Sequence, residues 1–173
     1  ALAHSWESRA DEIVRTAERR VDRTAAARLL APLVGEADNV ADALEEVAFL
    51  LTVVPDTARR QAIATLEPLC AIVNESVREY VRALEHARAC ARVRAAADVD
   101  EALVSVDRIA ELEHAGDRAE RTARATLLSV SGDFRELQAT TDIARAFEQA
   151  SDAVARCARI LRAYVLNPDG GTV

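Results

Sequence analysis

The residues of this chain that could do chemistry are acidic residues spaced four apart. The pattern (Glu/Asp)-x-x-x-Asp occurs as Glu7 and Asp11, Asp38 and Asp42, Glu113 and Asp117, and Glu148 and Asp152. On an α-helix, residues four apart project from the same side, about one turn apart along the axis. Like charges at this spacing repel each other, and a cation bound between them would remove the repulsion. Each pair is therefore a candidate half-site for a metal ion.

Two such helices side by side would offer four carboxylates, which is enough to bridge two or more hard cations. The chain has only three histidines and three cysteines, with no CxxC motif, so the donors would be nearly all oxygen. Oxygen donors favour iron, magnesium, manganese or calcium, and they also admit zinc. Open coordination positions would take water or an anion such as phosphate.

The alternative reading is that these acids are ordinary solvated surface, as a single pair on an acidic helix usually is. The third pair, Glu113 and Asp117, falls within the apolar stripe of its segment, which is unusual for two acids. The first pair flanks its stripe, and the other two pairs lie off theirs. The metal hypothesis therefore depends on the recurrence of the pattern, and it predicts a cluster toward the surface of the fold.

Other chemistry has little support in the sequence. Glu111 and His114 match the Glu-x-x-His pattern of ferritin-like di-iron helices, but only one copy is present and Glu111 points away from the apolar stripe. No Gly-rich phosphate loop and no catalytic Ser, His and Asp order is found. We expect a protein that is not an enzyme. Two alternatives stay open: a ferritin-like di-metal carboxylate enzyme, and a structural helical adaptor without metal.

The composition predicts that helices must position these acids. Of 173 residues, 50% are hydrophobic but only 3% are aromatic, and there are five glycines and four prolines. This composition nearly excludes a β-sandwich or barrel and predicts an all-α bundle. A net charge of −7 argues against nucleic-acid binding. No apolar run approaches the roughly 20 residues of a membrane span, so direct membrane insertion is not expected.

Apolar periodicity and helix breakers divide the chain into segments. Pro32 and Gly35 are expected to end the first helix, and Pro68 to kink or split the third. Asp98 with Glu101, and Asp133 with Glu136, predict capping boxes. The predicted helical segments are 2–30, 36–54, 57–96, 98–130 and 133–166, and residues 167–173 form a flexible tail.

The acidic pairs also indicate an internal repeat with an offset of 106 residues, from Glu7 to Glu113. Segments 57–96, 98–130 and 133–166 make a three-helix unit, and the first two segments match only its last two helices. The predicted domains are therefore 1–55, a first half whose first helix is absent from this chain, and 56–166, a complete second half. The first half should leave an apolar face for a neighbouring molecule or a missing N-terminal segment to cover.

The motifs resemble a known family. The stretches WESRADEIVR and EADNVADALEEVAFLL are similar to the first half of PhoU-like phosphate transport regulators. The stretches VDRIAELEHAGDRAERTARATLL and FEQASDAVARCARILRAYVLNPDG are similar to the second half. The chain resembles the shorter branch, whose members accompany Pit-type inorganic phosphate transporters. The resemblance implies two three-helix bundles and two metal clusters, the first at Glu7, Asp11, Asp38 and Asp42, the second at Glu113, Asp117, Glu148 and Asp152.

The chain departs from the family pattern in its first half. Asn39 stands where the family often has a further acid, and the connection over residues 30–36 is shorter than the family's proline-containing loop. The function implied is a bacterial metal-binding regulator or accessory of inorganic phosphate uptake. Iron is the first choice of metal, with zinc, magnesium, manganese or calcium as alternatives. The implied partner is an inner-membrane phosphate transporter or a sensor kinase, and a homo-oligomer is allowed. The location would be cytoplasmic, or peripheral to the inner membrane through that partner.

Overall fold

The computed structural model describes residues 25–54 and 60–167, which form helices joined by short connections and contain no strand. The prediction of an all-α bundle is therefore confirmed. The helices are α2 (Ala25–Val53), α3 (Arg60–Ala64), α4 (Glu67–Arg92), α5 (Ala96–Val130) and α6 (Phe134–Leu166).

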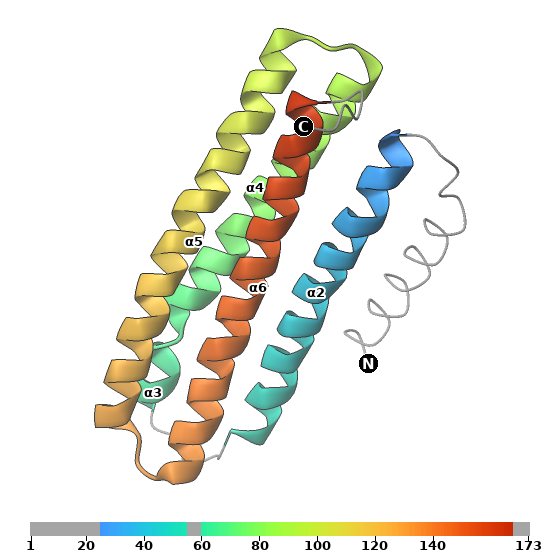
Figure 1. Cartoon of the computed structure of the whole chain (residues 1–173). Helices are drawn as coiled ribbons and strands as arrows, with labels where there is room; N and C mark the ends of the chain where they lie inside the picture. Colours follow the sequence, from blue (N-terminus) through green and yellow to red (C-terminus); the bar gives the residue numbers. More distant parts are fainter. Residues whose placement is uncertain (1–24, 55–59, 168–173) are drawn as a thin grey trace.

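Helix α6 lies at the centre of the arrangement and contacts α2, α4 and α5 (Figure 1). Helices α4, α5 and α6 also contact one another in every pairwise combination. Helix α2 runs antiparallel to α6 along its other side, as Figure 1 shows. The acidic pairs of α5 and α6 are therefore carried by adjacent helices.

Helix α2 is longer than expected, because it continues through Pro32 and Gly35. The predicted break at these residues, and with it the expected connection over residues 30–36, is wrong. Pro32 lies on the exposed side of α2, where the carbonyl that loses its partner can bond to water. Packing of the opposite side along α6 stabilises a helix that local propensity alone would interrupt.

The third predicted segment is split, as one of its two predicted forms required. Helix α3 ends at Ala64, and Pro68 occupies the first turn of α4, where its missing N–H has no helical partner to lose. The prediction of a capping box at Asp98 is wrong, because α5 already begins at Ala96 and its N-cap Ala95 makes no side-chain cap. Asp98 instead lies 3.4 Å from Nδ1 of His86 on α4.

The start of α6 follows the predicted capping pattern. Asp133 Oδ1 accepts hydrogen bonds from the backbone N–H groups of Arg135 at 2.8 Å and Glu136 at 3.0 Å. The Glu136 carboxylate in turn accepts from the N–H of Gly132 at 2.8 Å. These contacts satisfy backbone donors that have no partner within the helix. The predicted end near Leu166 is confirmed as well.

The core consists of two clusters of buried apolar side chains, and α2, α4, α5 and α6 contribute to both. Leu127 is central to the cluster that includes the C-terminal half of α2, and Leu161 to the cluster that includes Leu33. Helix α2 thus shares its core with the second half. The division at residue 55 stays a prediction, since residues 1–24 of the first half lie outside the part of the chain described. Exposed apolar side chains near the end of α2 include Phe49, Leu51 and Val53.

Two further observations concern the cysteines and the membrane. All three cysteines are free thiols; Cys157 is buried, Cys90 is half-buried and Cys70 is exposed. Packing as a small apolar side chain therefore describes Cys157 but not Cys70. Over the described ranges, no helix combines the length and the apolar character that a membrane crossing needs.

Candidate metal centre

Helices α5 and α6 bring together three of the predicted ligands at mid-length. Glu113, Asp117 and Asp152 each offer one carboxylate oxygen, and these three oxygens lie within 4.8 Å of one another. Glu113 and Asp117 share a face of α5 because they are one turn apart, and Asp152 faces them from α6. We call Glu113, Asp117, Asp152 and the neighbouring Glu120 and Glu148 the carboxylate cluster.

The spacing of the three oxygens suits a hard cation. Two oxygens bound to one ion at about 2.0–2.6 Å can be at most about 4–5 Å apart. Oxygens within 4.8 Å of one another are therefore at the scale at which several carboxylates can share one ion. The donor set is all carboxylate, which favours magnesium, calcium, manganese or iron over soft metals.

The three acids lie at the surface of the bundle, as predicted. The exposed fractions of their side chains are 25% for Glu113, 36% for Asp117 and 40% for Asp152. Such half-buried carboxylates keep enough rotamer freedom to adjust to an ion. Their position also leaves room for water or an anion to complete the coordination of a bound metal.

Glu148, the fourth predicted ligand, belongs to the cluster but lies outside the group of three oxygens. Burial raises the pKa of its carboxyl group above the ordinary value, and the charges of Asp152, Glu120 and Asp117 raise it further. Arg156 acts in the opposite direction. Ionisation of Glu148 is therefore less favourable than that of an ordinary glutamate when no cation is bound.

Glu120 was missed by the sequence reasoning. It is buried on α5, seven residues after Glu113 and three after Asp117, and its charge acts on Glu148. Positions separated by seven residues share a helix face, so the sequence does place Glu120 beside Glu113, although the motif itself contains only the spacing of four. Glu120 extends the cluster along α5.

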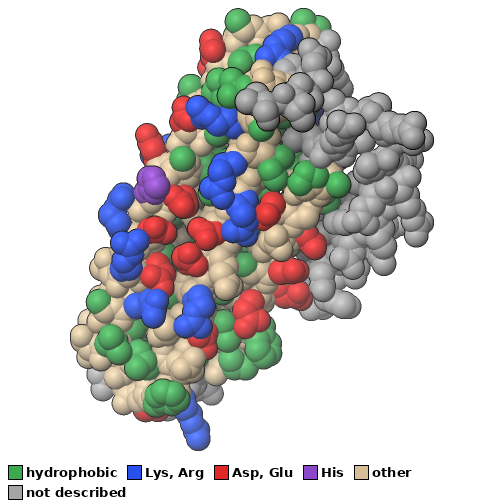
Figure 2. All heavy atoms as spheres, in the orientation of Figure 1, with side chains coloured by type: hydrophobic (Ala, Val, Ile, Leu, Met, Phe, Trp, Pro, Cys, Tyr) green, Lys and Arg blue, Asp and Glu red, His purple; other side chains and the backbone are tan. Residues whose placement is uncertain are grey.

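Each of three cluster acids is paired with the arginine four residues later on the same helix. Arg121 contacts Asp117 at 3.1 Å and Arg124 contacts Glu120 at 3.1 Å, while Arg156 lies 4.0 Å from Asp152. Figure 2 shows the result as red carboxylates gathered over α5 and α6 with blue arginines beside them. These arginines lie outside the motif itself, and they offset part of the repulsion between its acids. A cation would compete with the arginines for the same oxygens.

A close approach of α5 and α6 occurs beside the cluster at Gly116. A Cβ atom at this position would lie 3.3 Å from Ser151 Oγ of α6 and 3.8 Å from Ile72 Cγ2 of α4. Ser151 is buried, and its hydroxyl oxygen has no hydrogen-bond partner among the residues that the structure describes. The absence of a side chain at Gly116 therefore allows the two ligand-bearing helices to come close together.

The first predicted cluster is only partly within the described structure. Glu7 and Asp11 lie outside the described residues. Asp38 is half-buried and Asp42 is exposed on α2, and neither joins a group of three ligands with the residues that are described. The neighbouring Asn39 donates a hydrogen bond from Nδ2 to Glu36 Oε2 at 3.0 Å. The first site stays a prediction.

The Glu-x-x-His pattern does not form the buried centre that ferritin-like chemistry requires. The side chains of Glu111 and His114 are 69% and 70% exposed, respectively. Glu111 pairs with Arg108 at 2.9 Å, and His114 Nδ1 lies 2.8 Å from Glu113 Oε2. The geometry therefore gives the ferritin-like alternative no support.

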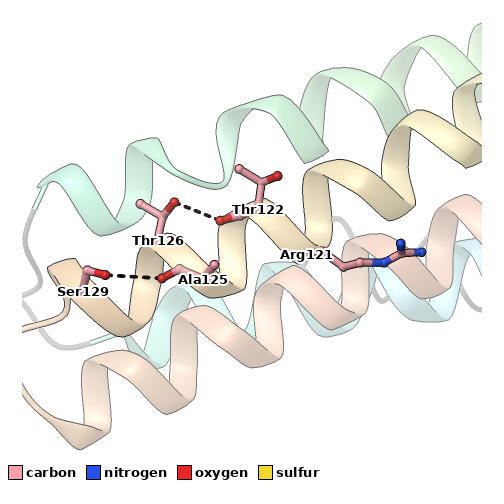
Figure 3. A pocket seen from close by; sticks show the side chains of 5 residues that line it. All are labelled: Arg121, Thr122, Ala125, Thr126 and Ser129. Carbon is pink, nitrogen blue, oxygen red and sulfur yellow. Dashed lines mark hydrogen bonds between the residues drawn. The ribbon is translucent and has the colours of Figure 1, made fainter.

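A shallow depression of about 530 Å³ lies beside the cluster on the outer side of α5 (Figure 3). Arg121 lines it together with Thr122, Ala125, Thr126 and Ser129. Three hydroxyl groups here donate to carbonyls of their own helix: Thr122 to Arg118, Thr126 to Thr122, and Ser129 to Ala125. The depression thus has hydroxyl donors that already serve the helix, and it does not present a convergent polar site.

Comparisons of the chain with protein-family models, curated proteins and solved structures give no match. The resemblance to PhoU-like regulators therefore stays a prediction from the motifs.

Proposed function

We propose that the chain binds a hard metal ion at Glu113, Asp117 and Asp152, with Glu148 adjoining, and that it acts as a regulator or accessory of inorganic phosphate uptake. The observation that carries the metal part is the gathering of three carboxylate oxygens within 4.8 Å. Iron is the first choice of metal, with manganese, magnesium, calcium or zinc as alternatives. The phosphate part is supported by the resemblance of the paired motifs to PhoU-like regulators.

A regulatory role suits the position of the cluster better than catalysis does. The ligands are half-exposed and paired with arginine or histidine side chains. A metal ion that binds would therefore replace these side chains as the partner of the carboxylates. A bound ion would supply positive charge and open positions for an oxyanion such as phosphate. The proposed partner is an inner-membrane phosphate transporter or a sensor kinase, which the protein would meet from the cytoplasm.

The metal part is tested by Asp117→Asn, which keeps the size of the side chain but removes an anionic ligand. We expect a lower metal content by elemental analysis and a smaller rise in Tm when Mn²⁺ is added. Saturation at 100 times Kd would add about 2.7 kcal/mol of stability to the wild type, and the variant should lose most of this gain. The control is Asp142→Asn, since Asp142 is an acid of the neighbouring helix α6 that is likewise paired with an arginine, Arg145, at 2.8 Å. Equal metal content and an equal Tm rise in Asp117→Asn and wild type would refute the metal site.

The phosphate part needs a cellular measurement. Deletion of the gene should alter phosphate uptake or the response to phosphate starvation, and wild-type protein should restore it better than Asp117→Asn protein. The protein should also copurify with a phosphate transporter or its sensor kinase. Unchanged uptake, signalling and partners in both phosphate-rich and phosphate-poor medium would contradict this role and favour the structural adaptor.

A further inference from the structure

Arg156 of α6 lies between the carboxylate cluster and helix α2. Its Nε donates to Glu36 Oε2 of α2 at 2.7 Å, and its Nη1 lies 4.0 Å from Asp152 Oδ2. The first contact is a close, charge-assisted hydrogen bond, whereas the second is at the outer limit of an ion pair. One guanidinium thus serves two acids on different helices, and one of those acids belongs to the cluster.

Glu36 is held in place to receive this guanidinium. Asn39 donates to the same Oε2 at 3.0 Å, from one turn further along α2. The hydrogen bond from Arg156 is the main cause that holds the pKa of Glu36 below its ordinary value, so the Glu36 carboxylate is ionised at neutral pH. Glu36 and Arg156 are 24% and 38% exposed, which leaves the interaction partly screened by water.

We propose that Arg156 couples the charge of the carboxylate cluster to the docking of α2 on α6. An empty cluster attracts the guanidinium toward Asp152 and weakens its contact with Glu36. A cation bound at Asp152 repels the guanidinium. The guanidinium then pairs with Glu36 alone, and this pair stabilises the docking of α2 on α6. The coupling is reciprocal, so Glu36 favours cation binding by keeping Arg156 away from Asp152. The role of a cation in this coupling rests on the proposed function, but the effect of cluster charge does not.

The first test removes one negative charge from the cluster without adding metal. Asp152→Asn should slow amide hydrogen exchange of α2 around residues 31–40 in the full chain by about two- to fivefold, the range of an exposed ion pair. Asp142→Asn, which removes an acid elsewhere on α6, should leave α2 unchanged. The slowing should vanish when Glu36→Gln is added to Asp152→Asn. Unchanged or faster exchange of α2 in Asp152→Asn would overturn the coupling.

The second test measures Mn²⁺ affinity by calorimetry in a double-mutant cycle. Glu36→Gln should weaken binding by about two- to fivefold, because the freed guanidinium moves onto Asp152. Arg156→Gln should strengthen binding, and in that background Glu36→Gln should have no more effect than Glu46→Gln, a control on the same helix. An undiminished effect of Glu36→Gln without Arg156 would mean bulk electrostatics and would overturn the coupling. No Mn²⁺ binding by the wild type would instead remove the proposed metal site, while the Asp152→Asn test would still decide the coupling by charge.

Discussion

Glu148 occupies a position where burial and three neighbouring carboxylates oppose ionisation. Both effects raise the pKa of its side chain above the ordinary value of 4.5. Below that value the group is protonated in the folded and unfolded states alike, so it costs the fold nothing. As pH rises, the unfolded chain ionises first and the folded state loses stability until the raised pKa is passed. The metal-free protein should therefore carry a penalty from Glu148 at neutral pH.

The variant Glu148→Gln should remove this penalty. We expect a higher Tm than the wild type at pH 7 without metal, with a gain of roughly 0.5 kcal/mol, as for like-charge pairs on helices. The difference in Tm between the variant and the wild type should disappear near pH 4. Saturating Mn²⁺ should raise the Tm of the variant by less than that of the wild type. Thermal melts at both pH values check the sign. A variant that is less stable than the wild type at pH 7 without metal would show that Glu148 is a structural acid.

At the scale of the elements, α5 and α6 approach closely because Gly116 has no side chain. Glycine inside a helix costs about 1 kcal/mol relative to alanine, so this position gives up helix stability for close packing. Within the described part of the chain, the added Cβ would be tight only against Ser151 Oγ at 3.3 Å, and this buried hydroxyl has no hydrogen-bond partner there. Gly35 in α2 is a matched case with open space, since nothing lies within 4 Å of its added Cβ.

The effect of Gly116→Ala on stability should therefore depend on the side chain at position 151. The double variant Gly116→Ala and Ser151→Ala should be about 1 kcal/mol more stable than Ser151→Ala alone, because the helix gains propensity without crowding. Gly116→Ala alone should raise the free energy of unfolding by a smaller amount, and Gly35→Ala should raise it by the full amount of about 1 kcal/mol. Urea unfolding of the set measures these differences. If alanine at position 116 still destabilises the chain when residue 151 is alanine, then backbone crowding rather than the hydroxyl governs the helix approach.

At the scale of the whole molecule, α4, α5 and α6 pass through both apolar clusters of the core. Leu127 is in the first cluster and Leu161 in the second, and their exposed fractions are 0% and 1%. Because the same helices connect the clusters, neither can come apart without exposing apolar surface of the other. The described helices should therefore unfold together, with α2 included.

Leu127→Ala and Leu161→Ala should each cost about 2–5 kcal/mol, the range for truncating a buried leucine. Each variant should unfold in a single cooperative transition with a lower Tm than the wild type, as followed by calorimetry and circular dichroism. Leu128→Ala is the control, because Leu128 is next in sequence but 73% exposed, and it should change stability by no more than about 0.5 kcal/mol. Two separate transitions in either core variant would indicate that the clusters unfold independently.

The sequence by itself determined the all-α class, an interruption near Pro68 as either a kink or a split, the cap of α6 and the placement of acids on common helix faces. These features follow from hydrogen bonds and periodicities within a few residues of one another. Only the tertiary structure decided that Asp152 rather than Glu148 meets Glu113 and Asp117, because that depends on how α5 and α6 are rotated and shifted against each other.

The same distinction explains the remaining differences. Helix α2 continues through Pro32 because packing along α6 outweighs a local preference, and no local signal reports that packing. Arg156 reaches Glu36 across 120 positions of sequence, and this pairing exists only because α2 docks beside α6. Contacts between distant segments depend on the packing of helix against helix, and the spacing of residues along one helix does not contain that information.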